Sequence, residues 1–205
     1  DLNIYANGGT AANGIYMKSH SRIRSSGGNV HINAIGARGI WGANNSISIR
    51  ANQDLTINAL AENSHAIYSD NYNLACTSGD LCGWVSDQGN IVINAINKAA
   101  NAYATYLRNP MIANGTTLGK GNITYTAVSK QGGIILDSDR GYIKAKGNVN
   151  LMAYSGSSGG EGIYIYEDGL SLTAADGGII RSETGDIIFS AYSANNVGLR
   201  MRNDN

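Results

Sequence analysis

The sequence predicts an all-β protein built as a parallel β-helix, or β-solenoid, of about eight irregular coils. Three observations predict this fold. A six-residue pattern occurs eight times, a second apolar segment follows most copies, and turn glycines precede several of them. No amphipathic helical period persists in the 205 residues, and 27 glycines with a single proline are typical of many tight turns between short strands.

The repeated hexapeptide reads Asp/Asn/Gly, aliphatic, any residue, apolar, any residue, Ala. Its apolar and variable positions alternate, which is the period of a β-strand. Successive copies begin 28, 25, 36, 32, 26, 21 and 17 residues apart. The copies are DLNIYA (1–6), NVHINA (29–34), DLTINA (54–59), NIVINA (90–95), NITYTA (122–127), NVNLMA (148–153), GLSLTA (169–174) and DIIFSA (186–191).

Stacking these copies predicts inward-facing ladders along the rod. The recurrent alanine fits a narrow corner of the coil, and Asn33, Asn58 and Asn94 should stack their side-chain amides on the outside. An antiparallel sandwich could use as many strands, but it has no reason to repeat one motif in the same phase. The first predicted ladder contains Leu2, Val30, Leu55, Ile91, Ile123, Val149, Leu170 and Ile187.

Two further strands per coil are predicted between the hexapeptides. We expect two inserted loops, near 69–89 and 103–121, in consecutive coils and therefore close in space. The second strand is read in GIYM (14–17), GIWG (39–42), AIYS (66–69), GIIL (133–136), GIYI (162–165) and GIIR (178–181). A third, weaker strand is read in SRIRS (21–25), SISIR (46–50) and GYIKA (141–145).

Composition limits the classes of function. The formal net charge is zero and 15% of residues are charged, which argues against a nucleic-acid partner. No apolar run approaches the roughly 20 residues of a membrane helix, so no membrane insertion of this segment is expected. The chain opens directly on a repeat, and we expect residues 1–205 to be a single domain cut from a longer chain.

Two cysteines, Cys76 and Cys82, lie close together in a loop sequence that contains Gly and Ser. This arrangement favours a local disulfide, which requires an oxidising compartment. The alternative is a pair of unrelated thiols in a cytosolic protein. No His or Cys spacing indicates a metal site, and no cofactor motif is present.

Repeats of the form DLTINA and GNIVINA, followed by a Gly-Ile type strand, resemble the haemagglutinin-like repeats of large bacterial exoproteins. Filamentous haemagglutinin and the stick-like effectors of contact-dependent growth inhibition belong to that group. The coils here are longer and more variable than the family's repeats, and its N-terminal secretion cap is not visible. The resemblance implies two-partner secretion, a location outside the cell or on the bacterial surface, and adhesion to a receptor.

The outward side chains of the hexapeptide strand show whether the chain could carry a catalytic site of the usual β-helix type. Polysaccharide-degrading β-helix enzymes carry paired carboxylates on such a face, but neither outward row here contains an acid. Acidic clusters around Asp137 or Glu161 keep a polysaccharide lyase or hydrolase as an alternative. The sequence favours a protein that is not an enzyme, and a purely structural spacer is the third possibility.

An aromatic stripe is the strongest candidate for a binding surface. If the isoleucines of the second strand face the core, the residues that follow them face outward on successive coils. Exposed aromatic side chains suit a receptor on a host or target cell, either a protein or a glycan. The alternative is ordinary cross-strand stacking that stabilises the sheet. The candidate binding residues are Tyr16, Trp41, Tyr68, Tyr72, Trp84, Tyr103 and Tyr106.

Overall fold

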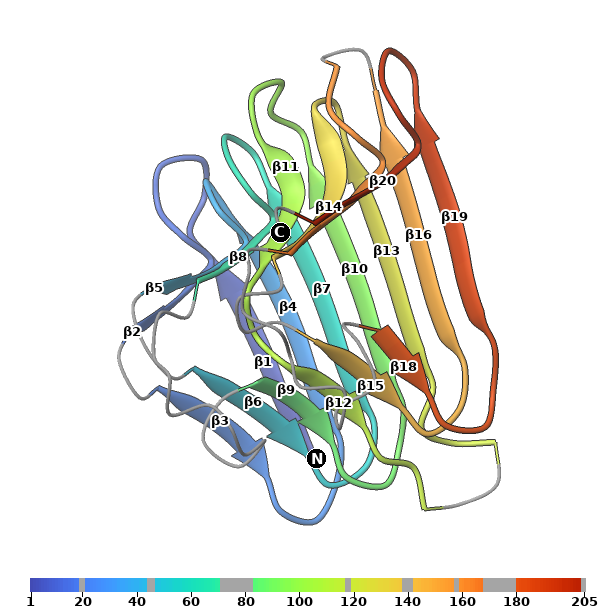
Figure 1. Cartoon of the computed structure of the whole chain (residues 1–205). Coiled ribbons are helices and arrows are strands. Elements are labelled where there is room, and N and C mark those ends of the chain that lie inside the picture. Colours follow the sequence, from blue (N-terminus) through green and yellow to red (C-terminus); the bar gives the residue numbers. More distant parts are fainter. Residues whose placement is uncertain are drawn as a thin grey trace.

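The computed structural model describes residues 1–18, 21–43, 47–70, 83–116, 119–137, 142–156, 159–167 and 180–203. Every regular element in these ranges is a β-strand. The strands form three parallel sheets of seven, seven and six strands, and each coil contributes one strand to each sheet in most of the rod (Figure 1). The predicted fold class, a parallel β-helix, is therefore confirmed.

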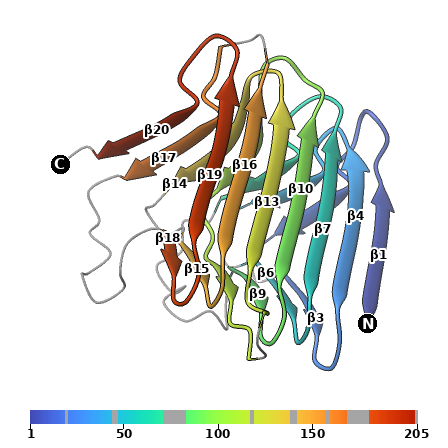
Figure 2. The same cartoon turned by 90° about the vertical axis from the view of Figure 1, so that its right-hand side faces the viewer.

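The first sheet is built from the hexapeptides and is seen face-on in Figure 2. Its strands pair in register, so that each recurrent alanine lies beside the alanine of the next coil, as Ala34 lies beside Ala59. In order along the rod, the strands are β1 (Leu2–Asn7), β4 (Val30–Gly36), β7 (Leu55–Ala61), β10 (Ile91–Asn97), β13 (Ile123–Ser129), β16 (Val149–Ser155) and β19 (Ile187–Ser193).

The other two sheets complete the coil. The second sheet contains β2 (Ile15–Lys18), β5 (Ile40–Ala43), β8 (Ile67–Ser69), β11 (Tyr103–Leu107), β14 (Gly132–Asp137), β17 (Ile163–Glu167) and β20 (Leu199–Asn203). The third sheet contains β3 (Arg22–Ser25), β6 (Ser48–Ala51), β9 (Gly83–Ser86), β12 (Met111–Ala113), β15 (Ile143–Ala145) and β18 (Ile180–Ser182).

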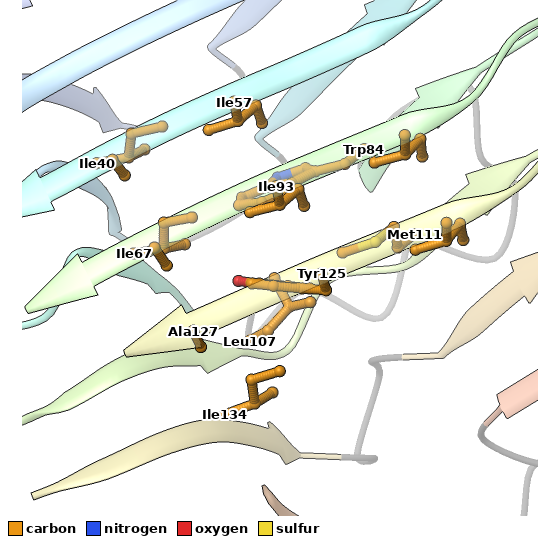
Figure 3. Packing of buried hydrophobic residues seen from close by; sticks show 14 of the residues in the cluster. Ile40, Ile57, Ile67, Trp84, Ile93, Leu107, Met111, Tyr125, Ala127 and Ile134 are labelled. Carbon is orange, nitrogen blue, oxygen red and sulfur yellow. The ribbon is translucent and has the colours of Figure 1, made fainter. Parts of the chain in front are cut away.

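The core runs along the rod between the three sheets (Figure 3). Inward isoleucines, valines and leucines of successive coils form its ladders, and burying them is the main favourable term for a fold whose single coil has no core. At the corner between the first and second sheets the walls approach closely. A Cβ atom on Gly39 would lie 2.6 Å from the carbonyl oxygen of Ala66 and 3.0 Å from the Cβ of Ala59, so this corner accepts only the smallest residues.

A continuous ladder of Asp and Asn side chains explains the first position of the hexapeptide. At each step, the side-chain Oδ1 of one coil accepts a hydrogen bond from the backbone N–H at the same position of the next coil. This bond joins neighbouring coils at the turn that enters the first sheet. The donors and acceptors are Asn29 to Asp1 (2.9 Å), Asp54 to Asn29 (3.0 Å), Asn90 to Asp54 (2.7 Å), Asn122 to Asn90 (3.1 Å), Asn148 to Asn122 (2.8 Å) and Asp186 to Asn148 (2.8 Å).

The strand order of the first sheet corrects one predicted neighbour in the inward ladder. The first sheet has seven strands in the described part of the chain, and Val149 pairs directly with Ile187. The predicted ladder neighbour Leu170, with the copy at 169–174, lies outside the described residues.

Two other assignments were wrong. The segment 178–181 was assigned to the second sheet, but Ile180–Ser182 pairs with β15 in the third sheet. The segment 103–121 was predicted as a loop, but most of its first half forms β11 and β12. The predicted loop 69–89 contains β9, and its residues 71–82 lie outside the described ranges.

Candidate functional site

The outward face of the second sheet carries the predicted aromatic row. Tyr16 pairs with Trp41, Trp41 with Tyr68, and Tyr68 with Tyr106, so the four side chains occupy one register position on four successive coils. The rings of Tyr16 and Trp41 lie 5.2 Å apart at 42°, and those of Tyr68 and Tyr106 lie 5.2 Å apart at 14°. Tyr106 thus continues the row on the fourth coil, and Ile135 interrupts it on the next coil.

Around Tyr68 and Tyr106 the row is joined to a buried ionic network centred on Arg108. The guanidinium contacts Asp70 through Nη1 at 3.1 Å and Asp137 through Nη2 at 2.7 Å, linking three coils. Both tyrosine hydroxyls donate to these carboxylates, Tyr68 to Asp70 at 3.0 Å and Tyr106 to Asp137 at 2.7 Å. The polar ends of the two rings are therefore already bonded within the protein.

The network changes the acidity of its members. Burial and the hydrogen bond to Asp137 raise the pKa of the Tyr106 hydroxyl far above its ordinary value. Burial alone would lower the pKa of Arg108, but the hydrogen bond to Asp137 and the charges around it raise that pKa overall. Tyr106 and Arg108 therefore keep fixed protonation states, which suits inter-coil bonding better than proton transfer.

Tyr103 and Glu161 form a second, smaller network. The Tyr103 ring lies over Gly132 of the next coil, where an added Cβ would collide with the ring, and its hydroxyl donates to Glu161 at 2.9 Å. Arg200 contacts the other oxygen of Glu161 at 2.7 Å. Burial, followed by this hydrogen bond, raises the pKa of Tyr103 to about 12. The acidic groups named for the enzyme alternative, Asp137 and Glu161, are thus both paired with arginine and tyrosine.

The first two coils differ from this pattern. Tyr16 is 52% exposed, and the guanidinium carbon of Arg38 lies 3.9 Å from the ring centre of Trp41, which is a cation–π contact. Within the described ranges no carboxylate pairs with Arg38. His65 packs edge-on against Tyr68 with ring centres 5.3 Å apart, and burial, with a smaller contribution from Arg38, lowers the pKa of His65 to about 4. Arg38 was not predicted as a site residue from the sequence. Its position three residues before Trp41 is the feature that could have indicated a contact with that ring.

The remaining candidate residues do not join this surface. Trp84 is 0% exposed and lies in the core between Ile49 and Met111, so its prediction as a binding residue is wrong. The physical reason is the strand period: Trp84 takes the inward position of β9, and its indole Nε1–H has no hydrogen-bond partner among the described residues. Tyr72, Cys76 and Cys82 lie outside the described residues, and the disulfide stays a prediction.

The described residues offer neither a metal site nor a membrane-spanning helix, and one surface hollow is occupied by an ion pair. No group of three His, Cys, Asp or Glu side chains in those ranges could hold a metal ion. In the same ranges no helix has the length and hydropathy to cross a membrane. A shallow hollow of about 370 Å³ lies beside β12 and β15, but its Glu183 carboxylate is already paired with Lys144 at 3.2 Å and Lys146 at 3.0 Å.

The fold places the chain in the structural class of parallel β-helix proteins. No protein-family model matches the sequence, and neither the curated proteins nor the solved structures contain a significant match.

Proposed function

We propose that this chain is a non-catalytic, receptor-binding segment of a secreted bacterial adhesin of the filamentous haemagglutinin type. The proposed binding site is the cluster of Tyr16, Trp41 and Arg38 on the first two coils. The partner is a protein or glycan on a host or target cell, and the chain acts outside the cell or on the bacterial surface.

One observation carries this proposal: an exposed tyrosine, a tryptophan and an arginine without a carboxylate partner in the described chain lie together on one face. Trp, Tyr and Arg are the residue types that most often dominate binding energy. On the same wall, Tyr68, Tyr106 and Tyr103 hold their hydroxyls in internal bonds, so they have less to offer a partner.

The enzyme alternative is less well supported by the geometry. A glycoside-cleaving pair needs one carboxyl group that can give a proton and another that can act as a base or nucleophile. Asp70, Asp137 and Glu161 each contact an arginine within 3.1 Å and accept a hydrogen bond from a tyrosine, so their oxygens are already engaged within the protein.

The test compares Tyr16→Ala and Trp41→Ala with the unchanged chain in a cell-adhesion assay. We expect each variant to lose at least about ten-fold in apparent affinity, because both remove a large ring from the centre of the cluster. Ile112→Ala, on the outward face of the third sheet, is the control and should bind normally. Circular dichroism establishes that each variant is folded.

Undiminished binding by folded Tyr16→Ala and Trp41→Ala chains would overturn the proposed site. The enzyme alternative has its own readout, which is release of product from a panel of polysaccharides. Product release that disappears in Asp137→Asn would replace the proposal with catalysis. Loss of adhesion in the ring variants without any product release supports it.

A further inference from the structure

The outward face of the first sheet is uncharged over its whole area. Seven strands present three outward rows, and none of these side chains is Asp, Glu, Lys or Arg. The first row is Asn3, His31, Thr56, Val92, Thr124, Asn150 and Ile188. The second row is Tyr5, Asn33, Asn58, Asn94, Thr126, Met152 and Ser190, and the third row is Asn7, Ile35, Leu60, Ile96, Val128, Tyr154 and Tyr192.

The third row, which we call the outer apolar row, is mostly hydrophobic and open to solvent. Ile96 is 46% exposed, Val128 38%, Tyr154 49% and Tyr192 53%. Seven of the eleven exposed large hydrophobic side chains of the described chain lie on this one face, and contiguous exposure of this kind marks an interaction surface. The seven are Tyr5, Ile96, Val128, Met152, Tyr154, Ile188 and Tyr192.

The polar side chains in the centre of the face are partly satisfied within the sheet. Asn58 donates through Nδ2 to Oδ1 of Asn33 at 2.9 Å, and Asn94 donates to Asn58 at 2.8 Å, which confirms the predicted amide ladder. Covering these amides therefore costs less than covering unbonded ones. Water can therefore be removed from this face without burying an unpaired Asp, Glu, Lys or Arg side chain.

We propose that this face is the interface between two copies of the chain, packed sheet against sheet. A face without charges offers nothing to an ionic partner but creates no repulsion against itself. Seven strands about 4.8 Å apart and seven residues of about 3.3 Å each give roughly 700–800 Å² per copy. A specific protein interface of standard size needs about 800 Å² per partner, so the whole face has the required area.

The outer apolar row determines how the two copies are oriented. A two-fold axis along the strand direction, passing through the fourth coil, brings this row onto itself with the two rods antiparallel. Ile96 then meets Ile96 of the second copy, Val128 meets Leu60, and Tyr154 meets Ile35. The large exposed rings of the last two coils thus cover smaller side chains of the first two: Tyr154 covers the half-buried Ile35, and Tyr192 covers the exposed Asn7.

A polysaccharide fits this row less well than a second copy. Sugars pack on the flat faces of aromatic rings, but Tyr154 and Tyr192 face each other, with ring centres 4.9 Å apart at 11°. The facing sides of these two rings cover each other, so mainly the ring edges and hydroxyls of the pair point toward a partner. Such edges can interdigitate with the aliphatic side chains of another sheet.

Sedimentation velocity of the 205-residue chain over micromolar to 100 µM concentrations tests the proposal. We expect a concentration-dependent dimer. Ile96→Lys should weaken it at least about ten-fold, because the two-fold axis would bring the two new ammonium groups together. Ile112→Lys, an equivalent substitution on the outward face of the third sheet, should leave the dimer unchanged.

A second variant reports the geometry directly. Under mild oxidation, Ile96→Cys should form a disulfide-linked dimer, whereas Ile112→Cys, with the same native cysteines, should not. A chain that stays monomeric at 100 µM, equal dimerisation of the two lysine variants, or a monomer retained by an uncharged polysaccharide would each overturn the proposal. None of these results bears on Tyr16 and Trp41, which lie on the second sheet.

Discussion

The outward faces of the first and second sheets are built on the same strand spacing but use their side chains in opposite ways. On the second sheet, rings, carboxylates and Arg108 bind one another between coils. On the first sheet, the amides bind one another, whereas Ile96, Val128, Tyr154 and Tyr192 of the outer apolar row are left exposed. The same repeated register can therefore give a sheet whose outward side chains bond one coil to the next, or a sheet whose outward side chains remain available for association.

The difference arises from the residue types that the register repeats. Tyr, Asp and Arg reach across about 4.8 Å to the next coil with a hydrogen-bonding end, so repetition brings complementary groups together. Ile, Val and Tyr in the outer apolar row gain only contact along the row and leave one side in water. The first two coils of the second sheet are intermediate, since no carboxylate of the described chain pairs with Tyr16 or Arg38, whereas Tyr68 and Arg108 both contact Asp70.

The largest effect should follow from removing the centre of the ionic network. Arg108→Met would leave Asp70 and Asp137 buried without their cation, and we expect it to lower the free energy of unfolding by about 3–5 kcal/mol. Urea denaturation measures this change. Arg24→Met, at an exposed position of the third sheet, is the control and should change stability by less than about 0.5 kcal/mol. If both substitutions changed the free energy of unfolding equally, the Arg108 network would not stabilise the second sheet more than an exposed arginine stabilises the third.

Acidification should weaken the second sheet through His65. Its pKa is lowered to about 4 in the folded protein, so between pH 6.5 and pH 4 the unfolded chain binds the extra proton. The stabilisation is complete above pH 6.5 and is lost as the pH falls, by about 2–3 kcal/mol between pH 7.5 and 4.5. Denaturation curves at several pH values check this, and His65→Gln should flatten the dependence. An equally steep loss in His65→Gln would assign it to other groups.

A smaller effect is expected at a buried hydroxyl pair of the core that joins the first and second sheets. Tyr125 and Thr105 are both 0% exposed, and the Tyr125 hydroxyl donates to Thr105 Oγ1 at 2.8 Å. Thr105→Val would leave that hydroxyl unbonded and cost about 1–3 kcal/mol. Adding Tyr125→Phe should restore part of the loss, because both polar groups are then gone. A double variant less stable than Thr105→Val in urea would contradict this reading.

The same pair shows where sequence reasoning failed and why. The hexapeptide predicted the inward position of Tyr125, but Thr105 occupies a place where neighbouring coils have Ile67 and Ile134. A polar residue at an inward position hid β11 and made 103–121 look like a loop. Only the three-dimensional contact with Tyr125 explains why a threonine is tolerated there.

Other features were open to prediction to different degrees. The strand period and the Asp or Asn at the first position of the hexapeptide were sufficient to predict the strands of the first sheet. A pattern that required Asp or Asn at that position would not have included the copy at 169–174, which begins with Gly169. Trp84 was misplaced because 69–89 was predicted as a loop, so the strand β9 and the inward position of Trp84 on it were missed. The outer apolar row was visible as the residue after each recurrent alanine, one position beyond the hexapeptide.

Double-mutant cycles measured by urea denaturation test the contrast between the two walls most directly. One cycle pairs Arg108→Met with Asp137→Asn on the second sheet, and the other pairs Tyr154→Ala with Tyr192→Ala on the first. We expect a coupling of about 2–3 kcal/mol for the first pair and about 0.5–1 kcal/mol for the second, whose rings stack in the open. A coupling between Tyr154 and Tyr192 as large as that between Arg108 and Asp137 would contradict the account.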